Sequence, residues 1–161
     1  MNPLQQPSLP DSLEVWVPTN RYDKDGQPTH MDGWNEIISA YRSNRHKGNA
    51  REIENVEYVA SYVREAMQSQ HWRAMRDKKR AVRCRVHLLF VERDRRRDIG
   101  NIHGGAKYAL DALTWRHPYG AGAILDDSQR WLADVTYSVT RNPNKPGLYM
   151  LVRALEERPM A

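Results

Sequence analysis

The chain has 161 residues, a formal net charge of +5 and a single cysteine. This length corresponds to about one domain, with a core large enough to fold without disulfides or structural metals. A single cysteine excludes a disulfide scaffold, and no segment reaches the length of a membrane span. Residues 1–10, MNPLQQPSLP, lack the basic and apolar regions of a signal peptide. We therefore expect one soluble, cytoplasmic domain over residues 1–161, with a flexible N-terminus at 1–11.

The positive charge is concentrated in one block. Residues 71–97 contain 11 Lys/Arg and 3 Asp/Glu, whereas residues 1–70 contain 7 and 10, and residues 98–161 contain 7 and 7. A solvated charged face would explain such a block. Because it ends where a group of aspartates begins, the charge distribution also favours contact with nucleic acid.

The N-terminal half predicts one strand and two helices. Residues 12–18 alternate apolar and polar side chains and end in proline, which is typical of a strand. From about residue 31 to 70 the apolar side chains recur at three- and four-residue steps, as on amphipathic helices. The hydrophilic stretch 44–50, NRHKGNA, is expected to separate the two helices.

The C-terminal half predicts three strands and a short helix. Residues 80–91 alternate Val82, Cys84, Val86 and Leu88 with basic residues, which indicates a strand with Cys84 half-buried. A loop at 93–105, a helix at 106–114, a glycine-containing loop and strands at 131–140 and 148–155 follow. The order β-α-α-β-α-β-β predicts an α/β domain with a mixed sheet of about four strands and helices packed on it.

Four residues near the basic block suggest phosphodiester hydrolysis. Asp98 and the pair Asp126-Asp127 can supply oxygen ligands to Mg²⁺, with Mn²⁺ as a substitute, and Lys107 can neutralise a phosphate. Each aspartate lies where a strand is expected to meet a loop, so we expect the sheet to bring the three carboxylates to one edge. The predicted catalytic residues are thus Asp98, Lys107, Asp126 and Asp127, and the aspartates are the predicted metal ligands.

Each of these residues also has a purely structural explanation. Asp126-Asp127 before Ser128 is a common turn or capping arrangement. Lys107 and Asp111 are four residues apart, the spacing of an ion pair on a helix. Asp98 follows three arginines and could form a salt bridge with them.

Two segments resemble the RusA-type Holliday-junction resolvases. The first is residues 95–129, which carry Asp98, Asn101, Lys107, Asp111-Ala112-Leu113, Leu125-Asp126-Asp127 and Gln129; the second is Pro18-Thr19-Asn20-Arg21-Tyr22 after the first strand. The resemblance covers roughly residues 13–155. It implies a homodimeric, magnesium-dependent endonuclease of mixed α/β fold, which nicks four-way DNA junctions symmetrically in recombination and repair. Such enzymes are often encoded by phages or prophages.

By this resemblance Asp98 is the first catalytic aspartate, Lys107 the catalytic lysine and Asp127 the later essential aspartate, with Asn101 and Asp111 around them. The sequence departs from the pattern at Gly100, where the family has its second aspartate. The spacing between Asn101 and Lys107 is also longer than is usual in the family, by about three residues. We expect that His103 does not replace the missing ligand, because a hard cation prefers oxygen.

Phosphate contacts are expected from two basic groups, Lys78, Lys79 and Arg80 and then Arg95, Arg96 and Arg97. Trp72 and Trp115 lie beside basic residues and could stack on an unpaired base. The apolar stripe of residues 51–67 could form part of a dimer surface or pack on the protein's own sheet. Two other functions stay open: a DNA-binding protein that cleaves weakly or not at all, and a nuclease of flaps or forks.

Overall fold

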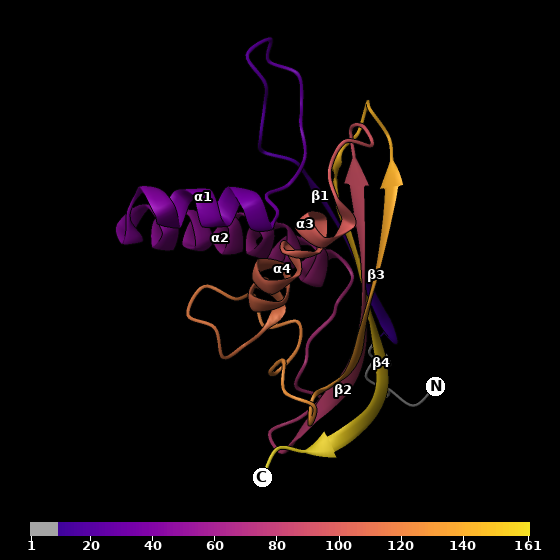
Figure 1. The fold of residues 1–161 in the computed structure, drawn as a ribbon. Helices are drawn as coiled ribbons and strands as arrows, with labels where there is room; N and C mark the ends of the chain where they lie inside the picture. The colour runs from indigo at the N-terminus through magenta and orange to yellow at the C-terminus, as the bar shows by residue number, and fades with distance from the viewer. Residues whose placement is uncertain (1–9) are drawn as a thin grey trace.

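The computed structural model describes residues 10–161, which form a single α/β domain with one layer of helices on a four-stranded sheet (Figure 1). The expected flexible terminus falls largely on residues 1–9, outside the described residues. The elements are β1 (Ser12–Pro18), α1 (Trp34–Ser43), α2 (Arg45–Ser69), β2 (Arg80–Glu92), α3 (Ile99–His103), α4 (Ala106–Leu113), β3 (Leu132–Arg141) and β4 (Gly147–Pro159). The mixed sheet confirms the predicted fold class.

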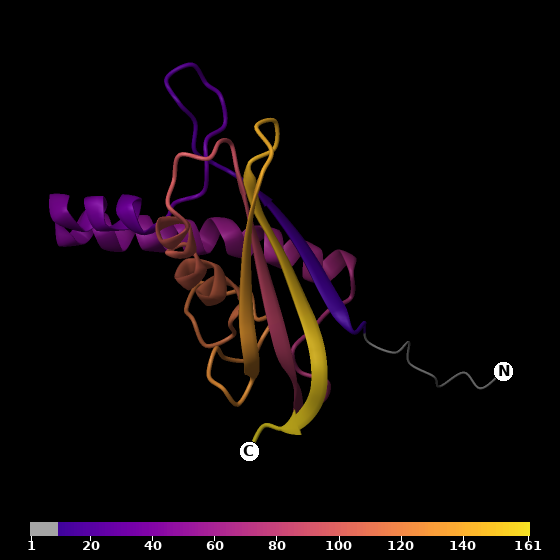
Figure 2. The same cartoon turned by 45° about the vertical axis from the view of Figure 1, so that its right-hand side comes forward.

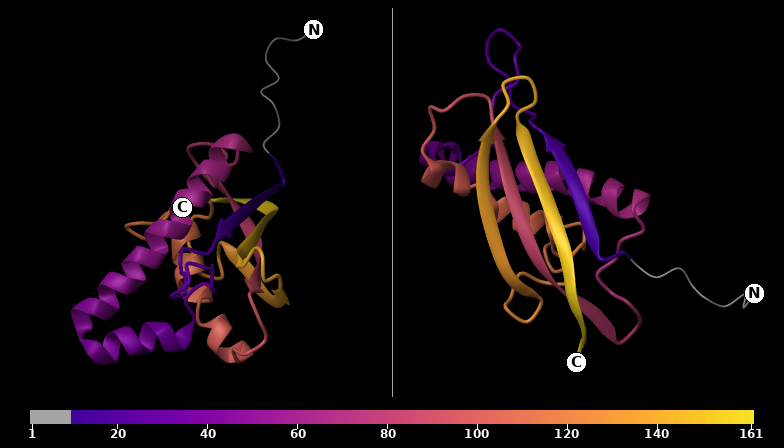
Figure 3. Two further views of the ribbon diagram at one scale, coloured as in Figure 1. Left: turned by 90° about the horizontal axis from the view of Figure 1, so that it is seen from above. Right: turned by 90° about the vertical axis from the view of Figure 1, so that its right-hand side faces the viewer.

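The strands are arranged in the order β1-β4-β2-β3, so that β1 and β3 form the two edges (Figure 3, right). β4 is antiparallel to both of its neighbours, whereas β2 and β3 are parallel. A parallel pair needs a crossover connection, and here it contains α3 and α4. The carboxyl ends of β2 and β3 therefore lie together at one end of the sheet, and their amino ends lie at the other.

Alternation along the strands separates the core from an open face. Leu13, Val15 and Val17 of β1 and Val86 of β2 are fully buried against the helices. The intervening residues alternate onto the other face, which no helix of residues 10–161 covers (Figure 2). Cys84 lies in the buried row, and burial raises the pKa of its thiol to about 12, so it stays a protonated core residue.

The break between the first two helices is shorter than the predicted 44–50. Helix α1 ends at Ser43 and α2 begins at Arg45, with Asn44 as the cap, whose side chain accepts a hydrogen bond from the Lys47 amide. Gly48 packs against the ring of Tyr41, which lets the helices approach closely. The expected loop was wrong because a capping asparagine and one glycine suffice for the turn.

Helix α2 packs on its own sheet: Val56, Val59, Ala60 and Val63 belong to the core. The segment expected to be a loop at 93–105 contains the additional short helix α3. In the described part of the chain, no helix is both long and apolar enough to span a membrane.

Candidate nucleic-acid and metal site

Asp98 lies at the N-terminus of α3, a few residues beyond the carboxyl end of β2. Its backbone oxygen accepts from the Ile102 amide, while its side chain is exposed and forms no capping hydrogen bond. Asn101, on the same short helix, accepts a hydrogen bond from the Asn35 amide at 2.6 Å. Asp98 is therefore free to meet a ligand, and Asn101 joins α3 to α1.

Lys107 and Asp111 form an ion pair on α4, with Nζ and Oδ2 3.2 Å apart. His117 Nε2 lies 4.0 Å from the same carboxylate oxygen. The three side chains line a cavity of about 360 Å³ together with Trp34 from α1. Lys107 and Asp111 thus form the helical ion pair that their spacing suggested. The side chain of Lys107 is nevertheless 71% exposed, so a larger ligand can reach it.

Asp126 and Asp127 lie in the loop before β3. The Asp126 carboxylate accepts from Arg116 Nη1 at 2.9 Å and from the Asp127 amide at 2.9 Å, so it acts as a turn residue. Asp127 is exposed.

The protomer does not bring the predicted metal ligands to one edge of the sheet. Asp98 follows the carboxyl end of β2, whereas Asp127 precedes the amino end of β3, and the paired stretch that separates these ends, Cys84–Glu92 on β2, spans roughly 30 Å. Among residues 10–161, no group of three or more His, Cys, Asp or Glu side chains is placed to hold a metal ion. One protomer therefore does not fit a cation shared by Asp98, Asp126 and Asp127.

A second cavity, of about 410 Å³, lies at the carboxyl ends of β2 and β3. Its walls combine the end of β2, the start of α3 and the end of β3; they include Glu92, Asp94, Arg95, Arg97, Ile99, Ile102, Val139, Thr140 and Arg141. Ligands of open α/β sheets commonly bind at the carboxyl ends of parallel strands. Asp98 adjoins this cavity through its neighbours Arg97 and Ile99.

Arg97 and Glu92 line that cavity, and the side chains of both are largely buried. Arg97 Nη1 donates to Glu92 Oε1 at 3.0 Å and to the Met31 carbonyl at 2.9 Å. Burial raises the pKa of Glu92, and the Arg97 charge partly offsets this rise. The side chain of Arg97 is only 12% exposed, so its expected role in phosphate contact is wrong for this conformation; it joins β2 to the loop before α1.

The other basic residues divide into paired and unpaired groups. On the open face of the sheet, Arg83 and Arg85 pair with Glu156 and Asp134. Of the predicted phosphate ligands, Arg80 pairs with Glu157 and Arg96 with Asp94.

Three predicted phosphate ligands keep an uncompensated charge. Within residues 10–161, the exposed side chains of Lys78, Lys79 and Arg95 form no ion pair. Lys78 and Lys79 lie before the amino end of β2 and Arg95 lies beyond its carboxyl end, so these charges stand about 40 Å apart along the strand.

Sequence reasoning missed the most buried charged group. Asp32, 3% exposed, accepts hydrogen bonds from Arg21, Arg51 and Asn55. Arg21 belongs to the Pro-Thr-Asn-Arg-Tyr segment of the resemblance, and here it fixes the loop after β1 to α2. The only sequence signal for this role was that Asp32, next to Gly33, has an arginine, Arg21 or Arg51, within 20 residues on each side.

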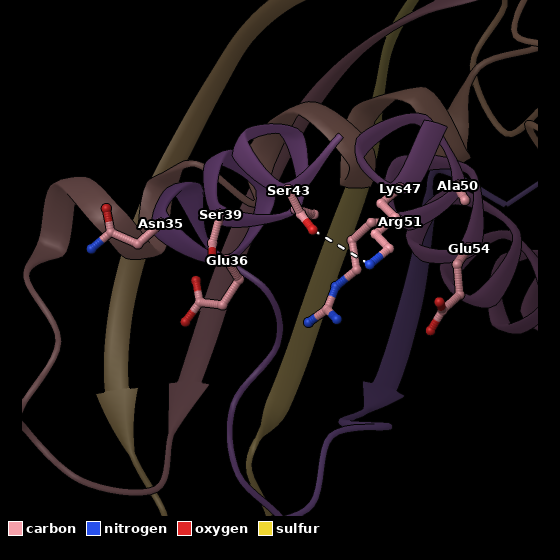
Figure 4. Close-up of a pocket in the computed structure, with 9 residues that line it drawn as sticks. Asn35, Glu36, Ser39, Ser43, Lys47, Ala50, Arg51 and Glu54 are labelled. Carbon is pink, nitrogen blue, oxygen red and sulfur yellow. Dashed lines mark hydrogen bonds between the residues drawn. The ribbon is translucent and has the colours of Figure 1, made fainter. Parts of the chain in front are cut away.

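A shallow groove of about 780 Å³ lies along the α1–α2 hairpin (Figure 4). Arg51 and Glu54 of α2 face Glu36 and Ser39 of α1 across it. The groove is lined by both acidic and basic side chains, so its charge does not favour binding of an anion.

The two tryptophans considered for base stacking differ in exposure. Trp72 is 3% exposed and donates from Nε1 to the Ala123 carbonyl at 2.8 Å, so it cannot stack on a base. Trp115 is 60% exposed, and stacking there stays a prediction. His103 contacts Tyr137, with ring centroids 4.9 Å apart, and among residues 10–161 it belongs to no metal-binding group.

No known family model matches the chain, and no curated protein matches it with significant sequence similarity.

Proposed function

We propose that the protein binds branched DNA and resolves four-way junctions as a magnesium-dependent endodeoxyribonuclease of RusA type. The observation that carries this proposal is the position of Asp98, whose exposed carboxylate forms no ion pair within residues 10–161 and lies beside Arg95 and the cavity at the carboxyl ends of β2 and β3. A phosphate-attracting charge and a carboxylate able to bind a cation thus adjoin the place where α/β proteins commonly bind ligands.

Binding would depend on the uncompensated cations. Lys78, Lys79 and Arg95 can contact phosphates without first breaking an ion pair, whereas Arg83 and Arg85 cannot. Contacts to phosphate position DNA without reading its sequence, so selectivity would come from the shape of the junction.

Cleavage would need Lys107 as a charge near a phosphate and Asp98 and Asp127 as oxygen ligands at separate positions, because within one protomer they lie at opposite ends of the β2–β3 pair. When bound, Mg²⁺ would stabilise charge on the phosphate and supply an activated water. Lys107 can exchange its Asp111 partner for a phosphate because the exposed pair contributes little free energy.

A second candidate is a DNA-binding protein that does not cut. Two observations favour it: Asp98 and Asp127 lie at opposite ends of the β2–β3 pair, and Gly100 stands where the resembled family has an acid. Replacing the carboxylates of Asp98 and Asp127 would then leave DNA binding, the protein's activity in this case, unchanged.

The decisive experiment is a nicking assay on a mobile four-way junction with Mg²⁺ or Mn²⁺, with duplex, flap and fork DNA in parallel. We expect paired nicks in the junction that Asp98→Asn and Asp127→Asn each reduce at least a hundredfold without loss of binding. Binding without nicks in any metal would establish the second candidate, and preferential cutting of flaps or forks would change the substrate.

A further inference from the structure

The cavity beside Lys107 lies among three helices, α1, α2 and α4, and has a volume of about 360 Å³ (Figure 1). Its lining includes two large apolar side chains that stay in contact with solvent, Trp34 at 53% exposure and Ile53 at 37%. Small-molecule sites commonly have volumes of about 300–1,000 Å³ and mostly apolar walls with a few polar groups. The cavity is therefore large enough for one planar ring system.

The ring of Trp34 is free to stack on such a ligand. Cationic side chains lie over the rings of Trp16, Trp72 and Trp131, at 5.0–5.3 Å from the centroids. Within residues 10–161, neither a cation nor another aromatic ring stacks on Trp34 in this way. An exposed indole with free faces is the kind of platform on which an unpaired nucleobase stacks.

Two polar side chains on the α2 side of the cavity are held in place by Tyr41. The Tyr41 hydroxyl donates to Glu52 Oε2, which raises the pKa of Tyr41, and it also lies 3.0 Å from Asn49 Oδ1. Within residues 10–161, the amide nitrogen of Asn49 and the second carboxylate oxygen of Glu52 have no hydrogen-bond partner. A donor and an anionic acceptor are thus left for a ligand in the cavity.

This pair of groups is complementary to the Watson–Crick edge of guanine. That edge carries one carbonyl oxygen beside two neighbouring N–H donor groups, whereas adenine, cytosine and thymine each carry a single donor group there. The carboxylate of Glu52 can accept from both guanine donors, and the amide of Asn49 can donate to the carbonyl oxygen. Hydrogen bonds to a charged acceptor are stronger than neutral ones, so guanine gains the most.

The α4 side of the same cavity offers positive charge for a phosphate. Lys107 is 71% exposed, and His117 lies beside its ion-pair partner Asp111. Glu52, in contrast, repels a phosphate. The charges therefore favour one orientation of a nucleotide, with the base towards α2 and the phosphate towards α4.

We propose that this cavity binds one unpaired guanine nucleotide. The base stacks on Trp34, its Watson–Crick edge meets Asn49 and Glu52, and its phosphate meets Lys107. The base must be unpaired, because in a duplex its Watson–Crick edge is already occupied. As a site for a guanine in DNA, the cavity deepens the proposed function and rests on it; it would add base selectivity to the phosphate contacts.

Titration of the full-length protein with free dGMP tests the cavity without a DNA strand. We expect the indole N–H signal of Trp34, assigned by its loss in Trp34→Phe, to shift in the NMR spectrum until it saturates. Binding of dAMP, dCMP and dTMP should be about tenfold weaker, and Glu52→Gln should remove this preference because its amide offers one acceptor fewer. A signal that does not move at up to about 10 mM dGMP, or equal affinities for the four nucleotides, would overturn the guanine site.

Duplexes that carry one bulged base test the site in DNA. The protein should bind a guanine bulge about tenfold more tightly than an adenine bulge or a fully paired duplex, and Trp34→Ala should remove about tenfold of that affinity. Trp16→Ala, on the open face of the sheet, is the matched control and should leave it unchanged. An equal loss in both variants would contradict a stack on Trp34.

The two arms separate this inference from the proposed function. Binding of dGMP by a protein that binds no DNA would refute the proposed function and leave the nucleotide site in place. Cutting of junctions by a protein that binds no dGMP, and in which neither Trp34→Ala nor Glu52→Gln changes bulge binding, would refute the guanine site alone.

Discussion

The carboxylate of Asp32 is held by the guanidinium of Arg51, whose Nε and Nη2 both donate to it. Arg21 and Asn55 donate to the same two oxygens, so one buried acid connects the loop after β1 to α2. Burial by itself raises the pKa of Asp32, but these hydrogen bonds and the two arginine charges more than offset it. The pKa therefore lies below its ordinary value of 3.8.

Asp32→Asn should destabilise the domain by about 3 kcal/mol near neutral pH, because it leaves two arginines without their anion. A lowered carboxylate pKa stabilises the fold above the unfolded value of 3.8, and this contribution is lost as the pH falls through the folded pKa. Urea unfolding should thus show a difference between wild type and variant that shrinks below that pH. Asp25→Asn, in an exposed loop, is the control; an equal effect of both variants would contradict this role of Asp32.

Gly104→Ala should lower stability by about 1–3 kcal/mol, because its methyl group would overlap Cβ and the backbone of Trp34. Gly100→Ala is the matched control: its methyl group meets no atom within 4 Å, and it lies inside helix α3. Thermal unfolding should show a lower midpoint for the first variant and an unchanged or higher one for the second.

Gly100→Asp should tighten Mg²⁺ binding by about tenfold, because it adds a carboxylate two residues after Asp98 in open space. The measurement is calorimetric titration of the full-length protein with Mg²⁺, with Gly100→Asn as a neutral control of similar size. Equal affinities of the Asp and Asn variants would show that position 100 does not face the cation.

Lys78→Ala/Lys79→Ala should weaken junction binding and lower the slope of log affinity against log salt by about 0.9 for each phosphate that is no longer neutralised. Arg83→Ala/Arg85→Ala removes the same number of charges, but from residues already paired with Glu156 and Asp134. Its effect on the slope should be smaller. Identical slopes for the two double variants would mean that the ion pairs do not protect the arginines from DNA.

Periodicity predicted the strands well because burial enforces it. Leu13, Val15 and Val17 alternate with polar residues, and the structure has β1 at Ser12–Pro18, as expected. The helix break was misplaced because the hydrophilic residues after Asn44 line the outside of α2 rather than a loop. Polarity marks exposure, and it does not distinguish an exposed helix from an exposed turn.

The candidate site could be predicted only residue by residue. The sequence indicated that Asp98 and Asp127 would each lie near a strand end, and both do. The sequence could not show whether those two strand ends lie at the same end of the sheet, because that depends on whether β2 and β3 are parallel. Antiparallel strands would have brought the aspartates together, whereas the crossover through α3 and α4 separates them.

The burial of Cys84 has a practical consequence for experiments. Maleimides and other thiol reagents attack the thiolate, which a buried sulfur with a pKa of about 12 hardly populates. A fluorophore can therefore be attached to a single engineered surface cysteine while the native one is kept. Energy transfer between this label and a second label on the DNA would then follow the protein on a junction in real time.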